Sequence, residues 1–194
     1  MTRWIDLLLL QAIGSCSAWQ LPRISFAEGL VRIQTGPSEL DEFPIPPKGT
    51  EISESVLDCI QVRDTGDPRK GFGAFCVHQN IPAKSFLGFY PGKRVVRNLD
   101  NLEASIVADN SGEYLMSLDG GLTFLDGFER AQDRSVFAPV HLNHKDKDDD
   151  GCNCVRRFAK GEVAFFTKRE IQVSEELCFD YGTSYWRGRE ADKV

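Results

Sequence analysis

The sequence lacks any uninterrupted apolar run of the ~18 residues that a helix needs to cross a membrane, so it predicts no stable membrane span. It is also short of basic residues, because 23 lysines and arginines stand against 29 acidic residues and leave a net charge of −6. A nucleic-acid partner requires a basic face that neutralises phosphates, so this balance argues against direct nucleic-acid binding. An acidic surface instead favours a protein substrate that presents a basic segment.

Disulfides and repeats are the next absences. Six cysteines are too few for a disulfide scaffold in 194 residues, and no internal repeat is visible. The sequence is 41% hydrophobic and 10% aromatic, which is enough to form a folded core. This length and composition indicate one domain with tails.

The first 18 residues have the features of a signal or targeting leader. Arg3 gives a positive start, the stretch from Trp4 to Ile13 is mostly apolar, and Cys16 and Ala18 are small residues spaced as at a cleavage site. A short amphipathic helix or a wrongly assigned gene start are the alternatives. A leader would imply a plastid or secretory route, and without one the nucleus or the cytosol is the default.

Proline marks the next division of the chain. Residues 19–54 include Pro37, Pro44, Pro46 and Pro47, and clustered prolines exclude a helix and a central strand. We therefore predict a proline-rich linker over 19–54, a folded domain over 55–186 and a C-terminal tail over 187–194.

The folded part contains short apolar and aromatic runs separated by glycines. These runs predict one short helix and several strands, which we place at 103–108 and at 56–62, 74–77, 86–90, 114–118, 163–167 and 177–181 respectively. Strands this short, with turn signals this frequent, favour small curved sheets with a few short helices over a doubly wound parallel sheet. The predicted fold class is mainly β.

Two short motifs could bind a polar ligand. In the glycine motif, Lys70-Gly71-Phe72-Gly73, two glycines beside an aromatic residue would let the backbone approach a ligand closely. The alternative is a tight turn between strands. In Asn143-His144 the two side chains offer hydrogen-bond donors and acceptors, which suits either a polar ligand or a network that fixes a loop.

Two further patterns point to metal ions. Residues 146–151 match the opening of a calcium loop, but Arg157 stands where the closing carboxylate belongs, so we predict a solvated acidic insertion. Two histidines and two cysteines suit tetrahedral zinc in kind, although one residue between the cysteines strains their joint ligation. We predict no metal. The alternative hypothesis is a zinc-dependent structure held by His141, His144, Cys152 and Cys154, which elemental analysis would test.

The order of the motifs is more specific than any one of them. The glycine motif, Asn143-His144, Asn153-Cys154 and the final run from Glu175 to Gly182 follow one another as in the SET-domain protein lysine methyltransferases, which the chain resembles over about 55–186. Intervening pieces agree with the same family at 80–84, 90–93, 125–126 and 168–171. The resemblance implies a SET-type fold with a knot-like threaded C-terminal segment. It also implies S-adenosylmethionine (SAM) as the methyl donor and a narrow channel for the substrate lysine.

Individual roles follow from the same resemblance. Tyr181 is the implied catalytic residue, and its hydroxyl would orient the methyl group and the incoming nitrogen. Methyl transfer depends on positioning and electrostatics, and desolvation beside a sulfonium would deprotonate the lysine without a dedicated base. The implied channel walls are Tyr90, Tyr114 and Phe179. The implied SAM-binding residues are Lys70, Gly71, Phe72, Gly73, Asn143, His144, Tyr181 and Trp186.

The chain departs from the family pattern near the donor site. Val140-His141 replaces the usual Arg-Phe pair, Lys145 replaces a serine, Lys93 replaces a glutamate, and residues 146–150 form a longer acidic insertion. These departures motivate an alternative function, a catalytically weak SET-like module that binds basic protein tails.

Overall fold

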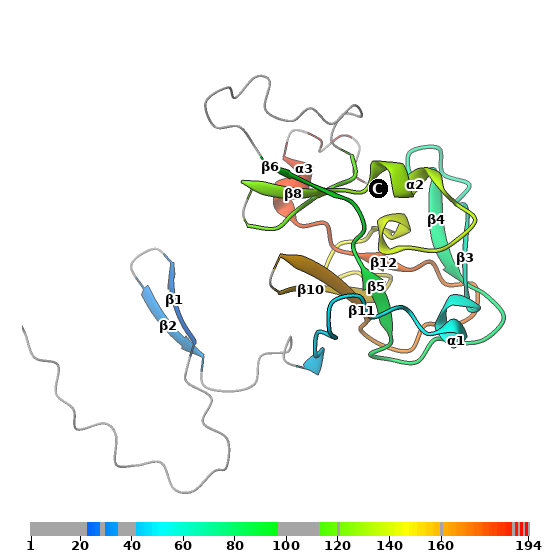
Figure 1. Cartoon of the computed structure of the whole chain (residues 1–194), viewed down its shortest axis with the longest axis horizontal. Coiled ribbons are helices and arrows are strands. Elements are labelled where there is room, and N and C mark those ends of the chain that lie inside the picture. Colours follow the sequence, from blue (N-terminus) through cyan, green and yellow to red (C-terminus); the bar gives the residue numbers. More distant parts are fainter. Residues whose placement is uncertain are drawn as a thin grey trace, which may run out of the picture. The chain divides into compact units, whose positions relative to one another are not determined.

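The computed structural model describes residues 23–27, 30–34, 42–96, 113–119, 121–159, 161–187, 189, 191 and 193 (Figure 1). The chain divides into two compact units, Met1–Glu42 and Phe43–Val194. The predicted leader over 1–18 and the predicted helix over 103–108 lie outside the described residues.

The first unit contains a two-stranded antiparallel hairpin. Strand β1 (Arg23–Ala27) pairs with β2 (Leu30–Gln34) in a register that runs from Arg23 opposite Gln34 to Ala27 opposite Leu30. Both strands are rich in apolar and β-branched residues, which favour a pleated strand. The hairpin lies in the early part of the stretch predicted to be a linker.

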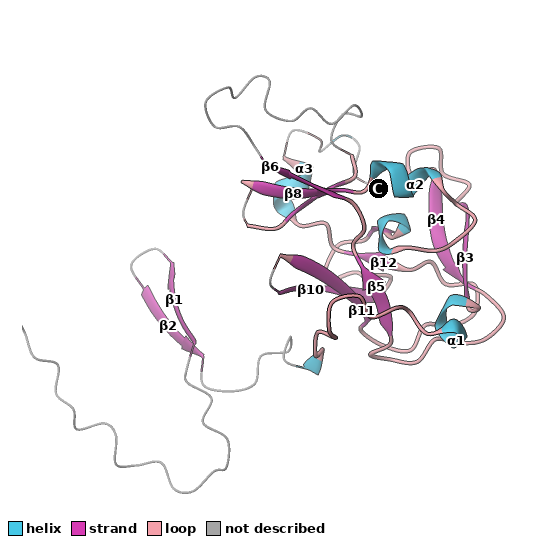
Figure 2. Cartoon of the chain, viewed as in Figure 1, coloured by secondary structure: helices cyan, strands magenta, loops and turns pink. Residues whose placement is uncertain are grey.

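The second unit is mainly β, as predicted, with small sheets joined by long loops (Figure 2). One sheet has the order β10 (Cys154–Ala159), β11 (Glu162–Thr167) and β5 (Phe86–Phe89), and all its pairings are antiparallel. The central strand β11 is buried from Val163 to Thr167. A strand buried on both faces reads as a continuous apolar run, and this explains why the run Val-Ala-Phe-Phe was recognisable.

Two further sheets of this unit are antiparallel. Strands β6 (Lys93–Val96), β8 (Thr123–Asp126) and β7 (Leu115–Ser117) form an antiparallel sheet in that order. Strands β3 (Ile60–Asp64) and β4 (Phe72–Cys76) form an antiparallel hairpin. The glycine motif enters the second strand of this hairpin, so its backbone is fixed by β pairing with β3.

The described helices are short. They are α1 (Glu54–Leu57), α2 (Phe128–Gln132) and α3 (Thr183–Trp186), and a 3-10 turn covers Pro139–His141. Among the described residues we find no helix with the length and apolar character needed to span a membrane.

One strand prediction is wrong in part. The predicted strand over 56–62 begins only at Ile60, because residues 54–57 form the helical turn α1. Ser53 has an extended backbone at the N-cap of this turn, Glu54 lies in its first turn, and Val56 is its buried residue. An acidic residue at a helix N-terminus favours this local conformation, and it competes with the weak alternation that predicted a strand.

The C-terminal segment brings the distant motifs together. Its residues 174–177 run antiparallel to β4, with hydrogen bonds from Cys76 N to Glu175 O and from Leu177 N to Ala74 O, both of 2.8 Å. It continues as β12 (Cys178–Phe179), which pairs in parallel with β9 (Asn143–His144). Figure 1 shows β12 near the centre of this unit. The glycine motif and Asn143-His144 therefore contact the same short segment.

The C-terminal segment contributes to the core of the second unit through Leu177 and Phe179. The largest fully buried apolar side chains are Phe165, Ile81, Leu87, Leu142, Ile171, Leu177 and Val163. Full burial of one side chain of this size stabilises the fold by about 1.5–3 kcal/mol relative to its exposure. The site residues are thus fixed to a packed interior.

Candidate active site

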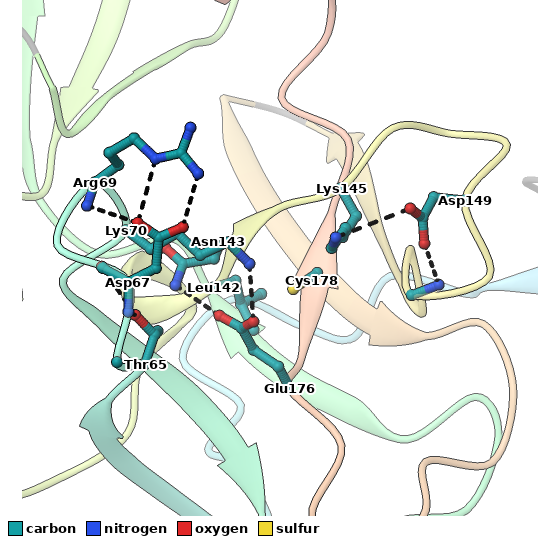
Figure 3. A network of polar contacts seen from close by, with 12 residues as sticks. Thr65, Asp67, Arg69, Lys70, Leu142, Asn143, Lys145, Asp149, Glu176 and Cys178 are labelled. Carbon is teal, nitrogen blue, oxygen red and sulfur yellow. Dashed lines mark hydrogen bonds and ion pairs between the residues drawn. The ribbon is translucent and has the colours of Figure 1, made fainter. Parts of the chain in front are cut away.

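The carboxylate of Glu176 connects three of the sequence motifs. Its Oε1 accepts a hydrogen bond of 2.7 Å from Asn143 Nδ2, and its Oε2 lies 3.1 Å from Lys70 Nζ (Figure 3). The side chains of Lys70 and Glu176 are only 14% and 17% exposed, so water screens their attraction weakly. One carboxylate from the final motif therefore fixes a residue of the glycine motif and the asparagine of the Asn-His pair.

The structure leaves no room for a side chain at Gly73. A Cβ at this position would lie 2.6 Å from Glu176 Oε1 and 2.7 Å from Asn143 Nδ2. Asn143 Nδ2 also donates to the Phe72 carbonyl at 3.1 Å. The close approach of the glycine motif to the other two motifs depends on this glycine.

Gly71, two residues earlier, has a different environment. Its φ is +65°, and an added Cβ would meet no atom within 4 Å. Its carbonyl accepts hydrogen bonds from the backbone and the hydroxyl of Thr65, at 2.9 and 2.8 Å. The backbone here is held in a left-handed conformation beside open space, which is the arrangement that a closely approaching ligand requires.

Asn153 holds the backbone of the C-terminal segment in place through its side-chain amide. It is 1% exposed. Its Nδ2 donates to the Glu176 carbonyl at 2.8 Å, and its Oδ1 accepts from Cys178 N at 2.9 Å. A buried amide with both ends satisfied positions the backbone on both sides of Leu177.

His144 is neutral and oriented by its neighbours. It is 4% exposed, and its Nδ1 accepts a hydrogen bond of 3.2 Å from Tyr181 N. The ring proton therefore resides on Nε2, which donates to Asp146 Oδ1 at 3.2 Å. Burial lowers the pKa of His144, and the nearby carboxylate only partly opposes this effect.

Tyr181 is half-buried, and its hydroxyl points in a defined direction. The hydroxyl donates to the Leu142 carbonyl at 2.8 Å. The ring centroid lies 4.8 Å from that of Phe179 and 6.0 Å from that of Trp186, which is stacked at 7°. Burial raises the pKa of Tyr181 well above its usual range, so the phenol remains a hydrogen-bond donor.

Two of the three predicted channel residues, Tyr90 and Phe179, pack against the ring of Phe165, while the ring of Tyr114 packs against Phe128. Phe179 lies edge-on to Phe165 with the centroids 4.8 Å apart, and Tyr90 contacts the same ring at 6.2 Å. The Tyr90 hydroxyl donates to the Tyr114 carbonyl at 2.9 Å. Burial raises the pKa of both tyrosines, so the group is aromatic and uncharged.

The structure brings the predicted site residues together. Lys70, Gly73 and Asn143 meet at Glu176, while His144 contacts the rings of Tyr181 and Trp186 at 5.2 and 4.7 Å. Sequence reasoning assigned no role to three residues that the structure places here: Glu176, Phe165 and Arg156. Glu176 belongs to the final motif and was therefore detectable. The other two lie on strands whose positions in space the sequence does not reveal.

The four side chains of the zinc hypothesis do not form a group that could share a metal ion among the described residues. Among the described residues, the one group of His, Cys, Asp or Glu side chains close enough to share a metal ion is His144, Asp146 and Asp180. Neither Cys152 nor Cys154 belongs to it. The Nδ1 of His144 is already used by Tyr181 N, and Asp146 Oδ1 pairs with Lys193 Nζ at 2.6 Å. Residues 146–150 are exposed, as expected of a solvated acidic insertion.

Comparison with known proteins places this site in a family. The model of the SET domain matches residues 71–182, from the first glycine of the glycine motif to the last glycine of the final motif. A solved structure of a humanized mutant of the Chaetomium thermophilum Polycomb Repressive Complex 2, bound to the inhibitor GSK126, has 17% sequence identity and a TM-score of 0.45. That match covers 63% of this chain and 15% of the chain in that structure. The search of curated proteins gave no match.

Proposed function

The chain belongs to the SET domain family, whose members are typically protein-lysine N-methyltransferases, and we propose that it transfers a methyl group from SAM to a lysine side chain of a protein substrate. The observation that carries the proposal is the convergence of the motifs on one segment. Glu176 joins Lys70 and Asn143, and three residues later the same segment supplies the aromatic group of Phe179 and Tyr181. The residues proposed for donor binding and those proposed for the channel therefore lie on one short segment or in contact with it.

Several features of the site fit SAM. Open space lies beside the left-handed backbone of Gly71, and the next residue, Phe72, is 38% exposed. Trp186 Nε1 is buried and has no hydrogen-bond partner among the described residues. A buried indole N–H normally has an acceptor. Trp186 therefore offers an unused hydrogen-bond donor, and Gly71 offers open space. Asn143 and His144 would hold the polar part of the donor, with Trp186 covering it.

The proposed catalytic contribution of the chain is positioning. When bound, SAM supplies a methyl group on a positively charged sulfur, and the lone pair of the lysine amine forms the N–C bond while the C–S electron pair stays on the sulfur. Tyr181 would orient the reacting groups through its hydroxyl, which the Leu142 carbonyl already directs. Because its proton is donated to that carbonyl, the hydroxyl would present its oxygen lone pairs to the reacting groups, and a preorganised dipole of this kind stabilises a transition state without reorganisation at the moment of reaction.

The channel residues would bind the lysine stem and exclude water. Phe179 is 4% exposed and Tyr90 is 7% exposed, so an amine among them would lose its hydration. Desolvation disfavours the charged form of an amine, and the neutral amine is the nucleophile. The exposed acidic insertion at 146–150 suits a substrate that presents its lysine in a basic segment.

A two-part experiment on the full chain tests this proposal. Titration calorimetry measures SAM affinity, and transfer of a labelled methyl group into a fractionated lysate, followed by mass spectrometry, identifies the modified residue. We expect saturable SAM binding and label on lysine. A folded protein that neither binds SAM nor labels any lysine would contradict the proposal.

A catalytically weak module that binds basic tails is the second candidate. The departures at Val140, His141 and Lys145 surround the Asn-His pair, and the acidic insertion follows directly. Binding of a lysine-rich peptide without any methyl transfer would favour this function.

A further inference from the structure

A positive charge lies beside the residues of the proposed aromatic channel. Arg156 on β10 donates from Nη2 to the main-chain carbonyl of Tyr181 at 3.1 Å and from Nη1 to Met116 Sδ at 3.6 Å. Its guanidinium carbon lies 5.5 Å from the ring centroid of Phe179. The cation therefore contacts the segment of the catalytic tyrosine and one of the channel rings.

Among the described residues, no carboxylate forms an ion pair with this guanidinium. Arg69, Arg130 and Arg169 pair with carboxylates at 3.1, 3.0 and 2.8 Å. Arg156 instead contacts a carbonyl, a sulfur and aromatic faces, which are weaker partners for a cation. Because arginine keeps its proton under all ordinary conditions, this charge is permanent.

One described acidic group acts electrostatically on Arg156 without forming an ion pair with it. Asp180 is the one described acidic group that raises the pKa of Arg156, and burial lowers that pKa more strongly. Asp180 Oδ1 already accepts from Gly182 N at 2.7 Å. On the facing segments, Tyr181 and Tyr114 are neutral because burial raises their pKa, and Phe165 opposite Arg156 on β11 carries no charge.

We infer that Arg156 is a positioning residue that selects the uncharged form of the substrate lysine. This inference rests on the proposed function. A lysine ammonium that enters beside Phe179 meets a fixed like charge in a site that excludes water, where repulsion is much stronger than in bulk water. The ammonium therefore gives its proton to bulk water on entry, and the neutral amine stays. Arg156 acts on the amine through its charge, and on Tyr181 through the hydrogen bond to its carbonyl.

The test uses n-butylamine as a probe of the channel, because it carries the amine and stem of lysine. Binding to the full chain loaded with S-adenosylhomocysteine is measured at pH 7 and pH 9.5. Arg156→Gln keeps an N–H donor for the Tyr181 carbonyl but removes the charge, whereas Arg156→Lys keeps the charge. Arg157→Gln is the matched control, because it removes one charge from the adjacent position of β10, whose side chain points to the opposite face.

In the wild type we expect tight binding only at the higher pH. In Arg156→Gln the ratio of the two affinities should fall about tenfold, which corresponds to a change of one unit in the pKa of the bound amine. Arg156→Lys and Arg157→Gln should retain the wild-type ratio. An unchanged ratio in Arg156→Gln, or an equal fall in Arg157→Gln, would overturn the inference.

The proposed function and this inference can fail separately. The absence of labelled methyl transfer by the wild type would contradict the proposed function. Butylamine binding reports on charge selection alone. If Arg156→Gln does not fold, the charge-retaining Arg156→Lys and the wild type still give a comparison. In that comparison a pH-independent affinity of the wild type would overturn the inference.

Discussion

The side-chain amide of Asn143 donates a hydrogen bond of 2.7 Å to the carboxylate of Glu176, although 33 residues separate them in the chain. The same carboxylate pairs with Lys70, 106 residues before it. These two contacts hold the glycine motif, the Asn-His pair and the final motif in one place. A single substitution at Glu176 should therefore disturb both the fold and the donor site.

Glu176→Gln should lower the free energy of unfolding and weaken SAM binding. The change removes the charge that Lys70 pairs with, in a region where both side chains are mostly shielded from water. Leaving a buried polar group without its partner costs about 1–3 kcal/mol. Urea unfolding measures the stability, and calorimetry measures SAM affinity.

An exposed ion pair supplies the matched control for Glu176→Gln. Glu129 pairs with Lys93 at 2.6 Å, but the side chains are 78% and 75% exposed. Exposed pairs of this kind contribute little, so Glu129→Gln should leave both measurements unchanged. Equal effects of the two substitutions would show that Glu176 has no special role.

Gly73→Ala should weaken SAM binding through steric conflict. The added methyl would press on Glu176 Oε1 and Asn143 Nδ2, which lie 2.6 and 2.7 Å from its position. Overpacking of this kind typically costs 1–3 kcal/mol. Gly49→Ala is the control, since its φ of +85° imposes backbone strain but no atom lies within 4 Å of the new Cβ. We expect SAM affinity to fall in Gly73→Ala and to be retained in Gly49→Ala.

The sequence was sufficient for the features that depend on local composition. The buried run of β11 and the glycine-rich turns predicted a mainly β fold, and the order of the motifs predicted the family that the comparisons found. The motifs themselves contain most of the residues that meet at the site. Their convergence was therefore predictable, even though its geometry was not.

What the sequence could not reveal depends on pairing between distant segments. Strand β10 contains two consecutive arginines, Arg156 and Arg157, and this hides its alternation from pattern analysis. Which of the two faces the channel is set by the register with β11, where Arg156 lies opposite Phe165. A shift of one residue in that register would exchange the two side chains. The role inferred for Arg156 was thus available only from the structure.

The stability of the protein should fall as the pH drops from 7.5 to 5.5. Burial lowers the pKa of His141 and of His144 below the ordinary value of 6.5. Below pH 6.5 the unfolded chain therefore binds more protons than the folded one, and the free energy of unfolding decreases until the pH reaches the folded-state pKa. His141→Gln should reduce this decrease, as measured by urea unfolding at both pH values.

The exposed histidine provides the control for that measurement. His78 lies on the surface with a φ of +65°, a conformation that asparagine tolerates. His78→Asn should keep the wild-type difference between pH 7.5 and pH 5.5. If His141→Gln also keeps it, proton binding at His141 does not contribute to the pH dependence.

Tyr181→Phe should separate methyl transfer from binding. The substitution removes the hydroxyl that donates to the Leu142 carbonyl at 2.8 Å, while the stacked ring contact with Trp186 can persist. Loss of one preorganised hydrogen bond in an active site typically costs 10²–10³-fold in kcat, so labelled transfer should fall by about this factor with SAM affinity nearly unchanged. Tyr185→Phe removes a hydroxyl from the neighbouring ring, 4.8 Å away, and should leave most of the activity. If instead Tyr181→Phe transfers methyl groups as fast as the wild type, Tyr181 is not the catalytic residue. If both the wild type and Tyr181→Phe bind lysine-rich peptides and neither transfers a methyl group, the protein is a binding module.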